Sequence, residues 1–114
     1  MKKKFEIKFL TDARDFIYGL DEKTSEKILY NIDKASYTMD SKLFKKLTRE
    51  IWEFRTKYNK NQYRLLAFWD KRDKQETLVI TTHGFIKKVS KVPSKEIKKA
   101  EKLMKEYFDQ GDNE

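Results

Sequence analysis

The stretch at residues 51–69, IWEFRTKYNKNQYRLLAFW, predicts two β-strands joined by a polar turn. In its first seven residues, Trp52 and Phe54 alternate with charged side chains, as in a strand with one face in water. The turn that follows contains two asparagines, which favour turns. The second strand, at residues 63–69, is almost wholly apolar, which is typical of a central strand. Arg64 is the one charged residue in that strand.

Two more strands complete the predicted sheet. A polar segment, DKRDKQE at residues 70–76, leads into the apolar run TLVITTHGF at residues 77–85. The connections in this part of the chain are too short for parallel crossovers, so these three strands should be antiparallel. Residues 3–9, KKFEIKF, also alternate between apolar and charged side chains, and they predict a half-buried strand near the N-terminus.

A helical hairpin should follow the first strand. Thr11 can cap a short helix that runs to Tyr18 and stops at Gly19. Asp21 can cap a longer second helix, in which apolar residues recur at spacings of three and four. That apolar stripe consists of Ile28, Ile32, Ala35 and Met39, with Leu29 beside it.

The last helix is predicted after Pro93, with Ser94 as its cap. Its apolar face consists of Ile97, Ala100, Met104, Tyr107 and Phe108. The expected order is β-α-α-β-β-β-α, in one α+β domain at residues 1–108 with a flexible tail at 109–114. We expect a mainly antiparallel sheet with the helical hairpin packed on one face and the other face open. Residues 41–49 fit neither a helix nor a strand clearly.

Composition narrows the classes of function. The 27 lysines and arginines exceed the 19 acidic residues and leave a net charge of +8, which suits a polyanion or an acidic protein partner, or else a solvated lysine coat. The chain has no cysteine and a single histidine, so thiolate zinc sites and histidine-rich metal sites are excluded, and no cofactor is expected. No apolar run approaches the roughly 20 residues that span a bilayer. We expect a soluble cytoplasmic protein with no membrane association.

The single histidine, His83, lies in the stretch TTHGFIKK. A lone histidine near a strand end is most often structural or exposed. Neighbouring strands could nevertheless bring it onto one surface with Arg55 and Arg64, and Gly84 would let another backbone approach closely. Arg64 needs either an ion pair, for example with Glu53, or a polar cleft, because an isolated cation in an apolar strand is costly.

Such a surface fits RNA cleavage without a metal ion. The RNA's own 2′-hydroxyl can attack the adjacent phosphorus, so the protein has to move protons and stabilise negative charge. A histidine can carry a proton near neutral pH, and arginine or lysine can hold phosphate oxygens. The candidate catalytic residues are His83, Arg64, Arg55 and Lys87, and the candidate RNA-binding residues are Lys57, Tyr58, Lys88 and Lys91. Each cation could also be a plain surface charge, since spacing alone does not force these side chains together.

Three segments resemble a known family of toxins. KKLTREIWEFR, QYRLLAFW and LVITTHGFIKKVSKVPSKEIKKAEKLMKEY are similar to the RelE/ParE superfamily of type II toxins, and most of all to its phage-derived, HigB-like branch. The resemblance runs from about Leu43 to Tyr107. It implies a RelE-like fold and a small basic toxin that cuts mRNA, usually on the ribosome, and so inhibits translation.

The resemblance also implies partners and residue roles. The partner would be a cognate antitoxin, acidic or of the helix-turn-helix, HigA-like kind, and operator DNA would be bound only through it. Arg55 and Arg64 match residues that bind phosphate and stabilise the transition state. Lys87 and Lys88 match further cations, and His83 matches the acid/base candidate. An open sheet edge or an exposed apolar helix stripe would suit antitoxin docking.

The sequence departs from the family pattern at two places. Glu53 stands where some RelE-type toxins carry lysine, and Val92 and Pro93 occupy the region where RelE-type enzymes place a tyrosine. Two alternatives to an RNA-cleaving enzyme therefore stay open. One is a non-catalytic inhibitor that binds the ribosome or, as in the ParE branch, poisons DNA gyrase. The other is a basic RNA-binding module without toxicity.

Overall fold

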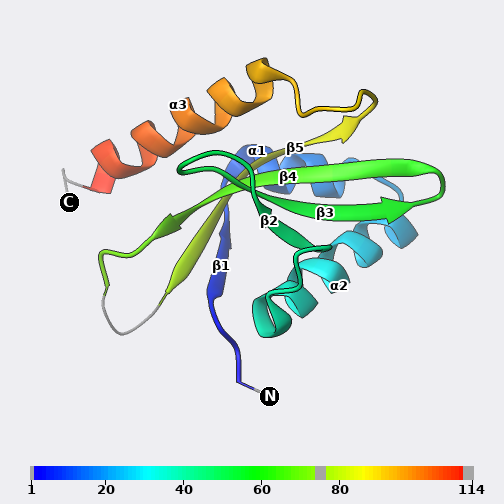
Figure 1. Cartoon of the computed structure of the whole chain (residues 1–114), viewed down its shortest axis with the longest axis horizontal. Coiled ribbons are helices and arrows are strands. Elements are labelled where there is room, and N and C mark those ends of the chain that lie inside the picture. Colours follow the sequence, from blue (N-terminus) through cyan, green and yellow to red (C-terminus); the bar gives the residue numbers. More distant parts are fainter. Residues whose placement is uncertain (1, 74–76, 112–114) are drawn as a thin grey trace.

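The computed structural model describes residues 2–73 and 77–111, which form a five-stranded sheet flanked by three helices (Figure 1). The elements in chain order are β1 (Glu6–Phe9), α1 (Thr11–Tyr18), α2 (Glu22–Thr38), β2 (Phe44–Lys46), β3 (Trp52–Tyr58), β4 (Asn61–Asp70), β5 (Leu78–Lys87) and α3 (Ser94–Gly111). The predicted α+β class is confirmed. Part of the predicted turn, residues 74–76, and the last three residues of the predicted tail lie outside the described residues.

The sheet has the strand order β1-β5-β4-β3-β2. The three predicted meander strands, β3, β4 and β5, pair antiparallel as expected. Two features of the sheet were not predicted. Residues 44–46, in the segment without a clear assignment, form the short edge strand β2 against β3, so the observed order is β-α-α-β-β-β-β-α. The first strand, β1, pairs in parallel with β5, the last strand in the sequence.

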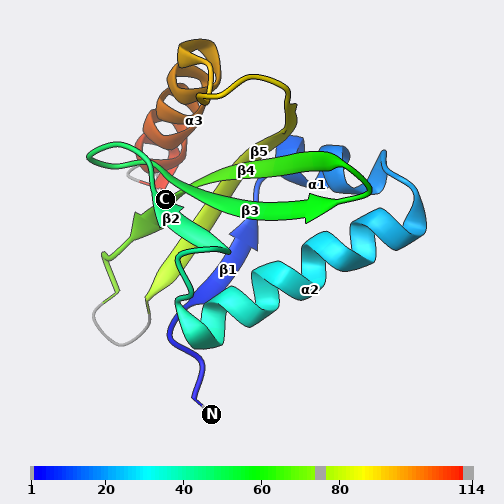
Figure 2. The ribbon, with the colours of Figure 1, turned by 45° about the vertical axis from the view of Figure 1, so that its right-hand side comes forward.

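Helices cover both faces of the sheet, so the expectation of an open face was wrong. The hairpin of α1 and α2 packs on one face, over a core that includes Phe5, Ile17, Ile28, Phe54 and Leu65. The last helix, α3, packs on the other face, over Ile51, Leu66, Phe68 and Ile80 (Figures 1 and 2). Successive side chains of β4 point to opposite faces, and the run from residue 65 to 68 is apolar throughout. Both faces of this strand therefore need an apolar cover.

The helix ends agree in part with the predicted caps. Asp21 caps α2 as expected, because its side chain accepts a hydrogen bond from the Thr24 backbone N–H. Thr11 does not cap α1: it is the first helical residue, and Leu10 occupies the cap position without a side-chain hydrogen bond. Leu29 lies outside the buried stripe of α2 and is 40% exposed.

The terminal helix begins and ends differently from the prediction. Ser94 is its first residue rather than its cap, and the Pro93 carbonyl accepts the first helical hydrogen bonds. The helix continues through Gly111, so residues 109–111 of the expected tail are helical.

Gly84 is required for the packing of α1 on the sheet, and not for the close approach of a backbone. A Cβ atom at this position would overlap the Phe16 ring, which packs on the glycine from α1. The backbone of Gly84 has no positive φ. The constraint is therefore steric and comes from a side chain.

We predict that Gly84→Ala lowers the free energy of unfolding by about 1–3 kcal/mol, because the added methyl group forces the Phe16 ring out of its place. Chemical denaturation measures the loss. Gly19→Ala is the control: Gly19 has φ −79° and ψ −8°, a conformation that alanine adopts readily, and an added Cβ would lie 3.2 Å from the Asp15 carbonyl oxygen without the overlap found at Gly84. Its effect should stay within about 1 kcal/mol, and equal losses in the two variants would contradict the assignment of Gly84.

Candidate functional site

Side chains of β3, β4 and β5 form a patch, here called the strand patch, on the sheet face that α3 partly covers. Residues opposite each other in antiparallel strands project to the same face. The register gives three rows of three: Glu53, Leu66 and His83; Arg55, Arg64 and Phe85; and Lys57, Gln62 and Lys87. The predicted catalytic residues therefore share one surface, although they do not lie at one point on it.

A β-bulge places His83 in the strand patch. Leu66 lies opposite His83 whereas the next residue, Ala67, lies opposite Thr81, so Thr82 is an extra residue in β5. One extra residue reverses which side chains point to each face of the strand. Without the bulge, His83 would point toward the face that α1 and α2 cover.

Arg64 lies in a buried ion pair at the centre of the strand patch. Its side chain is 3% exposed, with Nε 2.7 Å from Glu53 Oε1, and Nη2 donates a hydrogen bond to Gln62 Oε1. Burial lowers the pKa of the Arg64 guanidinium, and the Glu53 carboxylate opposes that change. Arginine nevertheless keeps its charge in proteins. The structural ion pair considered for Arg64 from the sequence is therefore present.

His83 lies at the buried end of the patch, beneath the first turn of α3. It is 2% exposed; Nε2 lies 3.2 Å from Glu96 Oε1 and Nδ1 lies 3.0 Å from Thr82 Oγ1. Burial lowers the pKa of the His83 ring, whereas the hydrogen bond to Glu96 favours protonation and the nearby Lys99 ammonium disfavours it. The neutral ring can donate its Nε2–H to the carboxylate, which ties β5 to α3.

A cationic cleft of about 550 Å³ opens at the other end of the patch, between α2 and the part of β3 that β2 does not cover. Figure 2 shows how α2 runs beside β3. Ten residues from four segments line it: Lys27, Asn31 and Lys34 of α2; Asp40, Lys42 and Leu43 after it; Arg55 and Lys57 of β3; and Gln62 and Arg64 of β4. Six of these side chains are cationic and one, Asp40, is acidic. A buried hydrogen bond from Asn31 Nδ2 to Thr56 Oγ1 fixes α2 against β3 beside the cleft.

The predicted site residues divide into two groups. Arg55, Lys57 and Arg64 line the cationic cleft, and Lys87 lies opposite Gln62 on the same face. The remaining candidates do not line it. His83 is buried, Tyr58 packs with the core beneath α1 and α2, and Lys88 and Lys91 are exposed on the segment between β5 and α3.

Three lysines of the cleft were not predicted from the sequence. Lys27 and Lys34 lie on α2 with Asn31 between them, at spacings of four and three, and Lys42 follows the helix. Such spacings place the three α2 residues on one face of the helix. That polar face was visible in the sequence, but its position beside β3 depends on how the hairpin docks.

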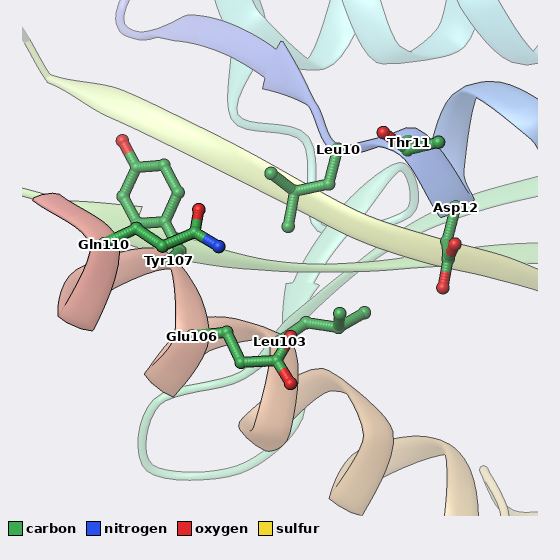
Figure 3. Close-up of a pocket in the computed structure, with 7 residues that line it drawn as sticks. All are labelled: Leu10, Thr11, Asp12, Leu103, Glu106, Tyr107 and Gln110. Carbon is green, nitrogen blue, oxygen red and sulfur yellow. The ribbon is translucent and has the colours of Figure 1, made fainter.

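A second cavity has a different character. A small cavity of about 180 Å³ lies where the start of α1 faces α3 (Figure 3). Its lining includes the carboxylates of Asp12 and Glu106 and no cation, so it does not suit an anion.

Within residues 2–73 and 77–111, no cluster of three or more histidine and acidic side chains is placed to hold a metal ion. Within the same ranges, no helix has the length and apolar character needed to cross a membrane.

We predict that protonation of His83 destabilises the fold. Because burial lowers the pKa of His83, the unfolded chain binds the proton more readily, and stability is lost as the pH falls below the unfolded value of about 6.5. The slope is at most about 1.4 kcal/mol per pH unit. Denaturation between pH 7.5 and 5.5 should show this loss, and His83→Gln, which keeps a side-chain donor for Glu96, should reduce it.

Asp70, another buried titratable side chain, should not contribute to the pH dependence of stability in this range. The hydrogen bonds from Arg72 lower its pKa to about 2, so Asp70 stays ionised throughout the range studied. Parallel stability curves for the wild-type chain and His83→Gln would contradict a proton-linked contribution from His83.

Comparison with known proteins identifies the family. No curated protein matches the chain. The model of the family described as phage-derived protein Gp49-like (DUF891) matches residues 15–105, well over half of the chain. This family is associated with the toxins of toxin–antitoxin systems, which implies a cognate antitoxin as a partner. The matched region contains the whole cationic cleft and the strand patch, and the chain belongs to the phage-derived, Gp49-like family.

Proposed function

We propose that this chain is the toxin of a type II toxin–antitoxin pair, and that it arrests translation by cleaving mRNA bound in the cationic cleft. The observation that carries the proposal is the cleft itself, where six cationic side chains from four segments surround one carboxylate. This balance of charge favours a polyanion. The net charge of +8 attracts the same kind of ligand.

The cleft supplies the cations that metal-independent RNA cleavage requires, and the base that takes the 2′-hydroxyl proton would be His83 or a neutral lysine of the strand patch. The 2′-oxygen bonds to phosphorus as the bond to the 5′-oxygen breaks, which leaves a 2′,3′-cyclic phosphate and a 5′-hydroxyl. Arg55, which is half-buried, would hold the phosphate oxygens as negative charge develops on them. The Arg64 side chain is 3% exposed and paired with Glu53, so its direct contact with phosphate would require that ion pair to open toward the cleft. Lys57 and Lys87 would bind the neighbouring phosphate or protonate the leaving oxygen.

His83 remains a candidate proton carrier, provided that RNA can reach its buried ring. In the resting fold both ring nitrogens have partners and the ring is buried. Direct proton transfer to RNA would require the first turn of α3, with Glu96, to move away from the sheet. Otherwise His83 acts as a positioning residue that ties β5 to α3, and the lysines of the strand patch carry the proton.

A second function is favoured by the burial of His83. If His83 cannot reach RNA and no lysine carries the proton in its place, the toxin would block translation by binding alone, on the ribosome or on mRNA. Such an inhibitor would use the same cationic cleft. The two functions therefore differ in whether mRNA is cut, and not in which residues bind it.

We predict that Arg55→Ala weakens the binding of a single-stranded RNA roughly three- to tenfold and lowers the salt dependence of binding by about 0.7 in log Kd per log salt, since one phosphate contact is lost. Fluorescence anisotropy with a labelled 12-nucleotide RNA at several salt concentrations measures both. Arg55 is half-buried without being in the core, so the fold should survive.

Lys102→Ala is the control for charge alone. Lys102 is exposed on α3, away from the cleft lining, and the substitution removes the same single charge. Equal effects of Arg55→Ala and Lys102→Ala would show that RNA responds to net charge, and the cleft would then not be the binding site.

We predict that induction of the chain without its antitoxin stops growth and produces new mRNA 5′ ends within minutes, at positions linked to codons. Sequencing of 5′ ends measures the cuts, and 5′-hydroxyl termini are expected from the proposed chemistry. Arg55→Ala should reduce both arrest and cutting. Arrest with intact mRNA would favour the binding inhibitor, arrest with broken DNA would favour gyrase poisoning, and normal growth would exclude a toxin.

A further inference from the structure

A second concave surface, here called the aromatic groove, is separate from the cationic cleft. It has a volume of about 470 Å³ and shares no lining residue with the cleft. Its lining residues are Lys46, Arg49, Glu50, Trp52, Phe68, Trp69, Lys71, Met104 and Phe108. We infer that the aromatic groove is the docking site for an acidic segment of the antitoxin that carries large apolar side chains. This inference rests on the proposed function as a toxin.

The floor of the aromatic groove is apolar and joins the two faces of the sheet. Trp52 and Trp69 pack with the core beneath α1 and α2, whereas Met104 and Phe108 pack on the α3 face; all four are partly exposed. Partly exposed tryptophan and phenylalanine in a concave surface are the kind of apolar anchor site that protein partners fill. Side chains such as leucine or phenylalanine would remove this area from water.

The rim of the aromatic groove is mainly cationic and favours a negatively charged partner. Lys46, Arg49 and Lys71 are exposed there, against a single carboxylate, Glu50. Cations around an apolar floor complement glutamate and aspartate placed around apolar anchors, and such complementarity steers association and fixes orientation. An acidic, amphipathic segment therefore satisfies both the floor and the rim.

The arrangement of the rings argues against RNA in this groove. Single-stranded RNA binds such surfaces by stacking its bases on free aromatic faces. Here the Phe44 ring stacks on Trp52 at 4.8 Å, and the Lys71 ammonium lies over the Trp69 ring at 5.6 Å. Trp52 and Trp69 also meet edge to face at 5.6 Å. One face of each tryptophan ring is thus already covered, which leaves less flat surface for stacked bases.

The chain provides its own probe for this groove. Its two tryptophans, Trp52 and Trp69, both line the aromatic groove, and neither lines the cationic cleft. Tryptophan emission excited at 295 nm therefore reports on the groove. A ligand seated in the groove should change this emission, whereas a ligand confined to the cleft should leave it nearly unchanged.

The test titrates the full chain with the purified antitoxin encoded beside it, at 150 mM salt, and separately with a 12-nucleotide uridine RNA. The antitoxin should shift the tryptophan emission, and the double variant Arg49→Glu with Lys71→Glu should weaken its binding at least tenfold. RNA affinity of this variant should change less than twofold to threefold.

The matched control reverses the same charge in the cleft. Arg55→Glu with Lys57→Glu should abolish RNA binding and leave antitoxin affinity within about threefold of the wild type.

Two results would overturn the inference while leaving the proposed function intact. They are antitoxin binding without an emission change, and equal losses of antitoxin affinity from the groove and cleft reversals. An emission change with RNA that the groove reversal abolishes would make the groove an RNA site instead. Failure of the proposed function is seen separately, as normal growth on induction.

Discussion

The ion pair between Arg64 and Glu53 divides one face of the sheet into two halves. A buried guanidinium without a partner is too costly to persist, so the charge at the centre of β4 requires the carboxylate from β3. Beyond this pair, Leu66 and Phe68 of the same strand lie in the core beneath α3. On the other side of the pair, toward the start of β4, Gln62 and the cationic cleft remain open to solvent. The apolar cover of α3 therefore ends where the cationic cleft begins.

Much of the fold could be predicted because local patterns determine it. The alternation in β3, the apolar run of β4 and the cap at Asp21 each depend on residues that are close in sequence. The parallel pairing of β1 with β5 and the cover of the second face by α3 depend on segments far apart in the chain. Periodicity within one element carries no information about which distant element covers it.

The candidate site shows the same division. Arg55, Lys57 and Arg64 could be predicted to lie together because a tight turn joins their two strands. A shared surface with His83 was considered from the sequence, but the bulge that places it there and its burial against Glu96 could not be predicted, because Glu96 belongs to another element. Lys27 and Lys34 were missed because their role arises only when α2 packs beside β3.

The parallel pairing of the first strand with the last has a consequence for synthesis of the protein. β1 emerges from the ribosome early, yet its partners in β5, from Leu78 to Thr81, are made about seventy residues later. Contacts so distant in sequence form late, since the chain between them must first be ordered. The sheet stays incomplete until most of the chain has been translated, so a partial product of synthesis lacks the finished strand patch.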